Sequence, residues 1–114
     1  MDIKKLNETV DEFVEERNWE QYHTPKNLVM ALSGEVGELI EIFQWLSPEE
    51  SNNLSEKDLQ SSKEEMADIL IYLIRLSNIL GIDLEDAVTE KLQINAKKYP
   101  VDLSVNNSIK YNKR

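Results

Sequence analysis

The chain has 114 residues, of which 40% are hydrophobic and 31% are charged, with a formal net charge of -9. This length fits one domain with a modest core, and the acidic excess argues against a nucleic acid or an anionic membrane as partner. The absence of cysteine excludes disulfides, thiolate metal sites and a cysteine nucleophile. The amino-terminal segment does not resemble a signal peptide, so we expect a cytoplasmic protein.

The first half of the chain predicts two helices. Apolar residues recur at helical spacing from residue 2 to about residue 18. Thr24 followed by Pro25 is typical of a helix start, and predicts a second helix that runs to about Leu46. We expect its packing face to consist of Val29, Leu32, Val36, Leu39, Ile40 and Phe43.

Two further long helices are predicted in the second half. Pro48 suggests a short helical turn over residues 48–51, and Ser55 is a capping residue for a third helix that ends at Gly81. This third helix is apolar over nearly half its circumference: Met66, Ile69, Leu70, Leu73, Ile74, Leu76 and Leu80.

Asp83 begins a fourth predicted helix, which Pro100 terminates. Residues 101–114 are expected to form an extended or mobile tail. No strand pattern competes, so the predicted fold is all-α: four helices, with the second and third as a central antiparallel pair.

Two pairs of carboxylates lie three residues apart on the central helices: Glu35 with Glu38, and Glu65 with Asp68. At this spacing two side chains project from the same side of a helix. A single acidic residue is usually a solvated surface group. Two such pairs beside apolar faces, without matching lysines or arginines, favour a site for a hard cation such as Mg2+ or Mn2+. A di-iron site would need two Glu-x-x-His motifs, and the chain has one histidine.

Other polar and aromatic residues allow two interpretations. Trp19, Tyr22, His23 and Trp45 are core or rim aromatics, or else the two tryptophans stack on a nucleotide base. Lys91, Asn95 and Lys98 form a polar stripe on the fourth helix, which is either solvated or the partner of a polyphosphate. Gly34 and Gly37 either permit close helix packing or leave room for a ligand.

Three blocks of the sequence resemble a known family. The motif EVGE at residues 35–38 and the motif EEMAD at residues 64–68 are similar to the ExxE…ExxD signature of the all-α, MazG-like nucleoside triphosphate pyrophosphohydrolases. With the segments around RNWEQYHTPKN and EKLQINAKKYPV, the resemblance covers most of residues 13–102 and points to the dCTP pyrophosphatase branch.

The resemblance implies a MazG-like domain over residues 1–102, followed by a tail over residues 103–114. It implies Mg2+-dependent hydrolysis of a (deoxy)nucleoside triphosphate, with a preference for dCTP or a modified dCTP, as a means of cleaning the nucleotide pool. It also implies a homodimer or homotetramer that completes the helical bundle. Glu35, Glu38, Glu65 and Asp68 match the metal-binding and catalytic positions. The positions associated with the nucleotide are matched by Trp19, His23, Trp45, Tyr72, Lys91, Asn95, Lys98 and Tyr99.

Two alternatives remain open at this point. One is a phosphoribosyl-ATP pyrophosphohydrolase, which shares the acidic core but does not account for the two tryptophans. The other is a helical module without catalytic activity, in which the acidic residues bind a structural ion or nothing.

Overall fold

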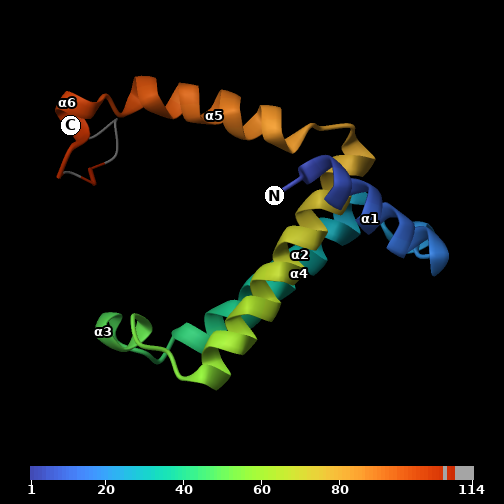
Figure 1. Cartoon of the computed structure of the whole chain (residues 1–114), viewed down its shortest axis with the longest axis horizontal. Coiled ribbons are helices and arrows are strands. Elements are labelled where there is room, and N and C mark those ends of the chain that lie inside the picture. Colours follow the sequence, from blue (N-terminus) through green and yellow to red (C-terminus); the bar gives the residue numbers. More distant parts are fainter. Residues whose placement is uncertain (107, 110–114) are drawn as a thin grey trace. The chain divides into compact units, whose positions relative to one another are not determined.

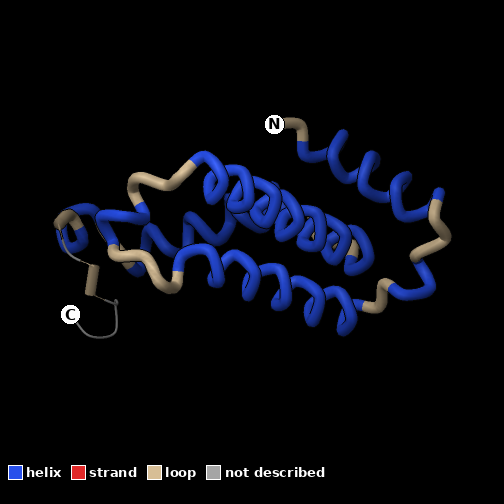
Figure 2. The backbone as a smooth tube through the Cα atoms, turned by 90° about the horizontal axis from the view of Figure 1, so that it is seen from below, coloured by secondary structure: helices blue, strands red, loops and turns tan. Residues whose placement is uncertain are grey.

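The computed structural model describes residues 1–106, 108 and 109 (Figure 1). In this part of the chain all regular structure is helical, as the sequence predicts, and no strand occurs (Figure 2). The elements in order are α1 (Ile3–Glu16), the 3-10 helix η1 (Glu20–Tyr22), α2 (Pro25–Phe43), α3 (Pro48–Ser51), α4 (Glu56–Leu80), α5 (Leu84–Lys98) and α6 (Val101–Ser104).

The chain divides into two compact units, Met1–Gly81 and Ile82–Arg114. In the first unit α2 and α4 run antiparallel and make the most extensive contact between any two helices, which confirms the predicted central pair (Figure 1). Helix α1 packs against α4. In the second unit α5 is followed directly by α6.

Side-chain caps explain where the long helices begin. The hydroxyl of Thr24 accepts a hydrogen bond from the backbone amide of Asn27, and the hydroxyl of Ser55 accepts one from the amide of Asp58. Each such cap stabilises a helix by about 1 kcal/mol. At the other end of α4, Gly81 has a φ of 68°, a left-handed conformation that glycine adopts without strain. The predicted boundaries of α4 are therefore confirmed.

Two other boundaries differ from the prediction. Helix α2 ends at Phe43, three residues early, because Pro48 favours an extended Ser47, whose ψ is 163°, and the chain must turn before reaching it. Residues 101–104, expected to belong to an extended or mobile tail, form the single turn α6. Of the remaining predicted tail, residues 107 and 110–114 lie outside the described part of the chain.

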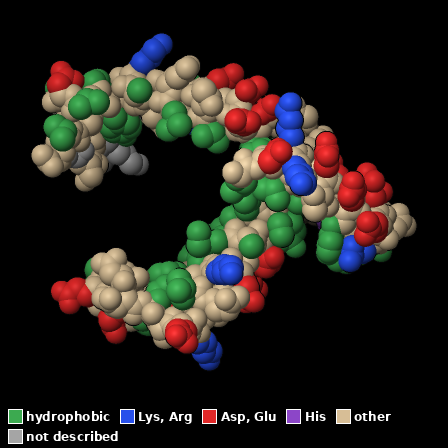
Figure 3. Space-filling model, in the orientation of Figure 1, with side chains coloured by type: hydrophobic (Ala, Val, Ile, Leu, Met, Phe, Trp, Pro, Cys, Tyr) green, Lys and Arg blue, Asp and Glu red, His purple; other side chains and the backbone are tan. Residues whose placement is uncertain are grey.

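The hydrophobic core of the first unit is small. Its buried apolar side chains are Val10, Val14, Leu28 and Ile74. Several residues that we expected on packing faces are exposed: Val29, Val36 and Ile40 on α2, and Met66, Leu73 and Leu80 on α4. Figure 3 shows hydrophobic side chains gathered along the α2–α4 pair. Both helices therefore have a second apolar face, which their own chain does not cover within the described residues.

On α4 these exposed residues form a regular stripe. Leu59, Met66, Leu73 and Leu80 follow each other at intervals of seven residues, and their exposed fractions are 61%, 61%, 37% and 51%. We call these four residues the heptad stripe. A spacing of seven keeps apolar side chains on one side of a helix and is typical of surfaces that pair with another helix.

The glycines of α2 and the apolar length of the helices bear on two further expectations. A Cβ atom added at Gly34 or Gly37 would meet no other described atom within 4 Å, so close packing inside this chain does not require glycine at these positions. No helix in the described residues is long and apolar enough to cross a membrane.

Candidate metal and nucleotide site

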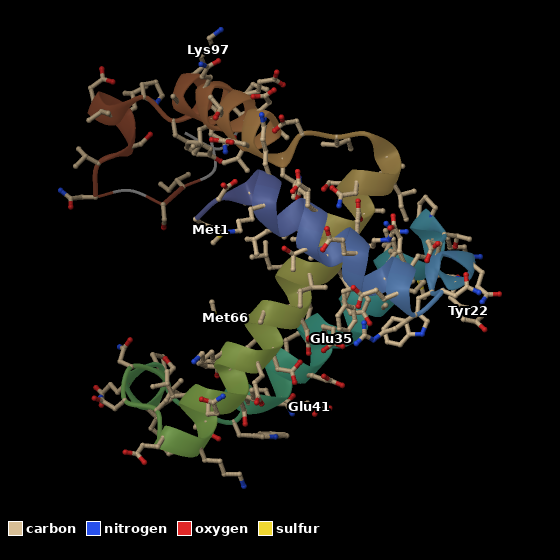
Figure 4. The ribbon with its side chains drawn as sticks, turned by 45° about the vertical axis from the view of Figure 1, so that its right-hand side comes forward. Met1, Tyr22, Glu35, Glu41, Met66 and Lys97 are labelled. Atoms are coloured by element: carbon tan, nitrogen blue, oxygen red, sulfur yellow. The ribbon has the colours of Figure 1, made fainter. Side chains whose placement is uncertain are left out.

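A cluster of three carboxylates forms where the middle of α2 faces the middle of α4. Glu35, Glu38 and Glu65 each offer an oxygen atom, and these atoms lie within 4.8 Å of one another. We call these three residues the carboxylate cluster. The three-residue spacing on α2 places Glu35 and Glu38 on one side of that helix, and the antiparallel pairing brings Glu65 opposite them. In Figure 4, Glu35 and Glu41 lie on one side of the α2–α4 pair and Met66 lies on the other.

Two oxygen atoms of the cluster have no partner within the described part of the chain. The Oε2 atoms of Glu35 and Glu65 are buried and accept no hydrogen bond among the described residues. The ion pairs formed in this part of the chain, Arg17 with Glu16 and Arg75 with Asp11, do not include the cluster. Buried carboxylate oxygens without donors are unfavourable unless a cation or a proton neutralises them.

The pKa values of the cluster reflect the electrostatic repulsion between its carboxylates. The neighbouring carboxyl of Glu35 raises the pKa of Glu65 to about 7, and burial and the nearby Glu38 act in the same direction. The neighbouring carboxyl of Glu65 lowers the pKa of Glu35, but burial and the nearby Glu38 and Asp68 raise it by more, so that this pKa is also raised. The cluster therefore binds either a proton or a cation more readily than isolated glutamates do.

Asp68 lies one turn beyond Glu65 on α4, outside the group of three whose oxygens lie within 4.8 Å. Its charge still contributes to the raised pKa of Glu35. Burial, together with the charges of Glu35, Asp68 and Glu38, raises the pKa of Tyr72, which places Tyr72 beside the cluster as well. The carboxylates on α2 and the residues Asp68 and Tyr72 on α4 thus form one acidic region.

Next to this region lies a largely apolar cavity of about 400 Å³. Its walls come from α1, the segment between α1 and α2, and α4, and they include Trp19, His23, Asp68 and Tyr72. The ring of Trp19 packs edge-on against Phe13, another lining residue, with 5.7 Å between ring centroids. Four residues that the sequence marked as candidates are therefore brought together around one cavity, and Asp68 links it to the acidic region.

Two residues of the cluster also line an open cleft of about 550 Å³, whose walls are Glu38, Glu41, Ile42, Asp58, Ser61 and Glu65. The sequence reasoning did not include Asp58 among the site residues, because its position near Ser55 explains it as part of a helix start. The available signal was its distance from Glu65, seven residues or two helical turns, which places both on one side of α4.

The remaining candidates lie elsewhere in the sequence, and Trp45 does not line the cavity. The side chain of Trp45 follows the end of α2 and is 85% exposed. Lys91, Asn95, Lys98 and Tyr99 lie on α5 and its C-cap, in the second unit. Their contact with a nucleotide stays a prediction.

Comparison with known proteins identifies the class. The model of the MazG-like family matches residues 30–113, and the chain belongs to this family.

Within the family, the chain is similar to dCTP pyrophosphatase 1 of Mus musculus, with 45% identity over 112 residues, and to its counterpart in Homo sapiens, with 44% identity. These matches cover 96% of this chain but 64% of each relative. A pyrophosphatase structure from Archaeoglobus fulgidus is similar with a TM-score of 0.81 and 43% identity, over 85% of this chain and 91% of that one. The predicted resemblance to the dCTP pyrophosphatase branch is confirmed.

Proposed function

We propose that the chain is a nucleoside triphosphate pyrophosphohydrolase that converts dCTP, or a modified dCTP, to the nucleoside monophosphate and pyrophosphate. The observation that carries this proposal is the carboxylate cluster, two of whose buried oxygens lack a hydrogen-bond donor among the described residues, next to a cavity lined by Trp19, His23 and Tyr72. The names of the mammalian relatives support dCTP as the substrate. A cytoplasmic location, and a role in clearing unwanted nucleotides from the pool, fit this activity.

The donor set fits a divalent cation. Carboxylate oxygens are hard ligands that suit Mg2+ and, as a substitute, Mn2+. On this proposal Glu35, Glu38, Glu65 and Asp68 hold the ion or ions. When bound, Mg2+ supplies charge neutralisation for the phosphates and for the leaving pyrophosphate.

The carboxylates have a second task in the proposed reaction. A water molecule attacks the α-phosphorus, the bond from this phosphorus to the α,β-bridging oxygen breaks, and pyrophosphate leaves with that oxygen. The attacking water must be oriented and must lose a proton, and a carboxylate oxygen of the site accepts it. Positioning of the reactants and stabilisation of charge together account for most of the rate enhancement in such reactions.

The nucleoside end of the substrate is assigned to the apolar cavity. Trp19 offers a face for stacking, and His23 and Tyr72 offer polar contacts at the wall. We assign contacts with the nucleotide also to Trp45, and contacts with its phosphates to the α5 stripe of Lys91, Asn95 and Lys98 with Tyr99.

We further propose that the chain acts as a homodimer or homotetramer. The heptad stripe supports this, because four exposed apolar side chains in register on α4 form a surface that a second α4 could match about a two-fold axis. The exposed Val29, Val36 and Ile40 on α2 add apolar surface that a second chain would bury.

The test is a panel of nucleotides assayed for pyrophosphate release with Mg2+, with Mn2+ and with EDTA. We expect Glu38→Gln and Asp68→Asn to abolish turnover and to keep the helical circular dichroism spectrum, because each change removes a ligand charge without removing a packing group. Glu64→Gln is the matched control, since Glu64 is exposed beside the cluster and its loss changes the net charge equally. Near-normal turnover of the two mutants would remove these residues from the site.

The same panel separates the alternatives. Release of pyrophosphate from phosphoribosyl-ATP, with none from deoxynucleotides, would favour the histidine-biosynthesis activity. A lack of turnover with every nucleotide and metal would favour a non-catalytic module.

A further inference from the structure

A partly buried polar network lies at the wall of the apolar cavity, outside the carboxylate cluster. Its centre is Arg75 on α4, whose side chain is 11% exposed. Arg75 Nη1 donates to Asp11 Oδ1 on α1 over 2.8 Å, and Arg75 Nε donates to His23 Nδ1 over 3.3 Å. One guanidinium thus joins three segments that are far apart in the sequence.

Asn78 stabilises the network through two further hydrogen bonds to α1. Asn78, one turn after Arg75, donates from Nδ2 to Asp11 Oδ1 over 2.9 Å and to the backbone oxygen of Asn7 over 3.3 Å. Asp11 therefore receives two donors and is held in place from α4. A rigid fork such as guanidinium, fixed at Nη1, leaves its Nε–H with a defined direction.

The contact with His23 has a chemical consequence. A neutral imidazole has one N–H, and a nitrogen that accepts a hydrogen bond cannot be the one that carries the proton. Because Nδ1 accepts from Arg75, the proton lies on Nε2. Burial lowers the pKa of His23, the Arg75 guanidinium lowers it further, and Glu20 opposes both. The ring is therefore neutral near pH 7.

The groups around His23 come from three elements. Arg75, Asp68 and Tyr72 belong to α4 and line the same cavity, Glu20 belongs to η1, and Asp11 of α1 acts through Arg75. Arg75 makes the hydrogen bond to the ring.

We propose that Arg75 is a positioning residue for the nucleobase end of the site, which acts by holding His23 as the Nε2–H tautomer. His23 then presents a single, fixed hydrogen-bond donor at the cavity wall, suited to an acceptor on a base edge, such as a carbonyl oxygen or an unprotonated ring nitrogen. This inference rests on the proposed function, since it takes the cavity to be the base pocket. Because the tautomer is already fixed in the free protein, binding of the base does not include the free-energy cost of selecting it.

The first test does not depend on turnover. His23 is the only histidine in the chain, so the ring-nitrogen NMR signals of uniformly labelled protein report on it alone. We expect Nδ1 to be unprotonated and Nε2 to be protonated in the wild-type chain, with a pKa below the ordinary 6.5. Arg75→Met should give a mixture of tautomers. Asn78→Ala is the matched control, because it removes donors to Asp11 but leaves the bond between Arg75 and His23, and it should keep the wild-type tautomer.

A second variant guards against misfolding. Arg75→Met leaves Asp11 without its cation, so the double variant Asp11→Asn/Arg75→Met makes the pair neutral while Asn78 can still donate to residue 11. The double variant should show the same mixture of tautomers. A protonated Nδ1 in the wild-type chain, or an unchanged tautomer in both variants, overturns the proposal.

The second test is kinetic. Arg75→Met should raise the KM for the preferred nucleotide by about two- to tenfold, the range expected for the loss of one hydrogen bond, with little change in kcat. In a His23→Ala background the same substitution should have no further effect, because Arg75 acts only through the ring. Equal effects of Arg75→Met with and without His23 overturn the proposal. Lack of turnover by the wild-type chain counts against the proposed function, whereas the NMR result then still decides whether Arg75 sets the tautomer.

Discussion

At the scale of single residues, the pair formed by Glu35 and Glu65 determines how the site responds to pH. In the folded chain without a cation, the raised pKa of Glu65 lets the pair retain a proton at pH values where the same carboxyl would be ionised in the unfolded chain. The ordinary pKa of Glu65 is 4.5, and in the folded chain it rises to about 7. The folded state therefore binds more protons than the unfolded state between these two values.

The raised pKa makes the stability of the fold depend on pH. A raised carboxyl pKa stabilises the fold fully below pH 4.5, and this contribution is lost as the pH rises through about 7. We expect the melting temperature in EDTA to fall between about pH 5 and about pH 8, and addition of Mg2+ at the upper pH to restore it. Thermal unfolding followed by circular dichroism measures both effects.

The comparison of two glutamine variants makes this prediction specific. Glu65→Gln should lose most of the pH dependence, because it removes the carboxyl that holds the proton. Glu64→Gln removes the same charge at the exposed neighbour and should keep the dependence. If both variants show the wild-type slope, the repulsion within the cluster is not its cause.

Trp19 and Trp45 provide a second comparison at this scale. Trp19 lines the cavity, whereas the side chain of Trp45 is 85% exposed. We expect Trp19→Ala to raise KM and to reduce discrimination between bases more than it lowers kcat. Because stacking contributes about 1–3 kcal/mol per base, the change in apparent affinity should be roughly tenfold or somewhat more.

The sequence predicts the same effect for Trp45→Ala. An equal rise in KM would mean that assembly brings Trp45 to the base. An unchanged KM would restrict base recognition to the cavity. If Trp19→Ala also left KM and selectivity unchanged, Trp19 would be a packing residue.

At the scale of helices, the sequence predicted what depends on local chemistry. Thr24, Ser55 and Gly81 bound the two central helices as expected, because caps and left-handed glycines act over four or five residues. The carboxylate cluster was predictable for a related reason. Helical periodicity places Glu35 beside Glu38, and the pairing of consecutive antiparallel helices brings Glu65 opposite them.

Two features of the structure could not be predicted from the sequence. A strongly apolar helix does not indicate which of its faces meets its own chain, so the exposure of Met66, Leu73 and Leu80 was not predicted residue by residue. The bonds from Arg75 to Asp11 and His23 join residues 64 and 52 positions apart, and no local pattern encodes them. A lone arginine in the apolar run around residue 75 was the one available signal.

Glycine substitutions test the packing of α2. Glycine within a helix is less favourable than alanine by about 1 kcal/mol, and a Cβ at the exposed Gly34 meets no described atom within 4 Å. We therefore expect Gly34→Ala to raise the melting temperature by a few degrees in a thermal unfolding experiment.

The matched control is Gly81→Ala. An added Cβ there also meets nothing, but the φ of 68° strains any residue with a side chain, so this variant should be less stable than the wild type. A loss of stability in Gly34→Ala would show that a second chain occupies the space beside this glycine.

At the scale of the whole molecule, the heptad stripe leads to a prediction about assembly. Multi-angle light scattering at micromolar concentration should give a multiple of the 13.3 kDa chain mass. Met66→Glu places a charge at 61% exposure within the stripe and should shift the mass toward that of a single chain. Gln60→Glu adds the same charge on α4 outside the stripe and should keep the assembly. A wild-type mass of one chain would rule the assembly out.

The small core of the first unit has a consequence for how much active protein a cell contains. Leu28 and Ile74 are the largest side chains that are completely buried. On the proposed assembly, a second copy supplies the missing cover, so that folding and association become one reaction whose equilibrium depends on protein concentration. For such a dimer, each tenfold dilution weakens the folded state by about 1.4 kcal/mol. At low expression the amount of active dimer would then rise with the square of the amount synthesised, so that halving synthesis would lower it about fourfold.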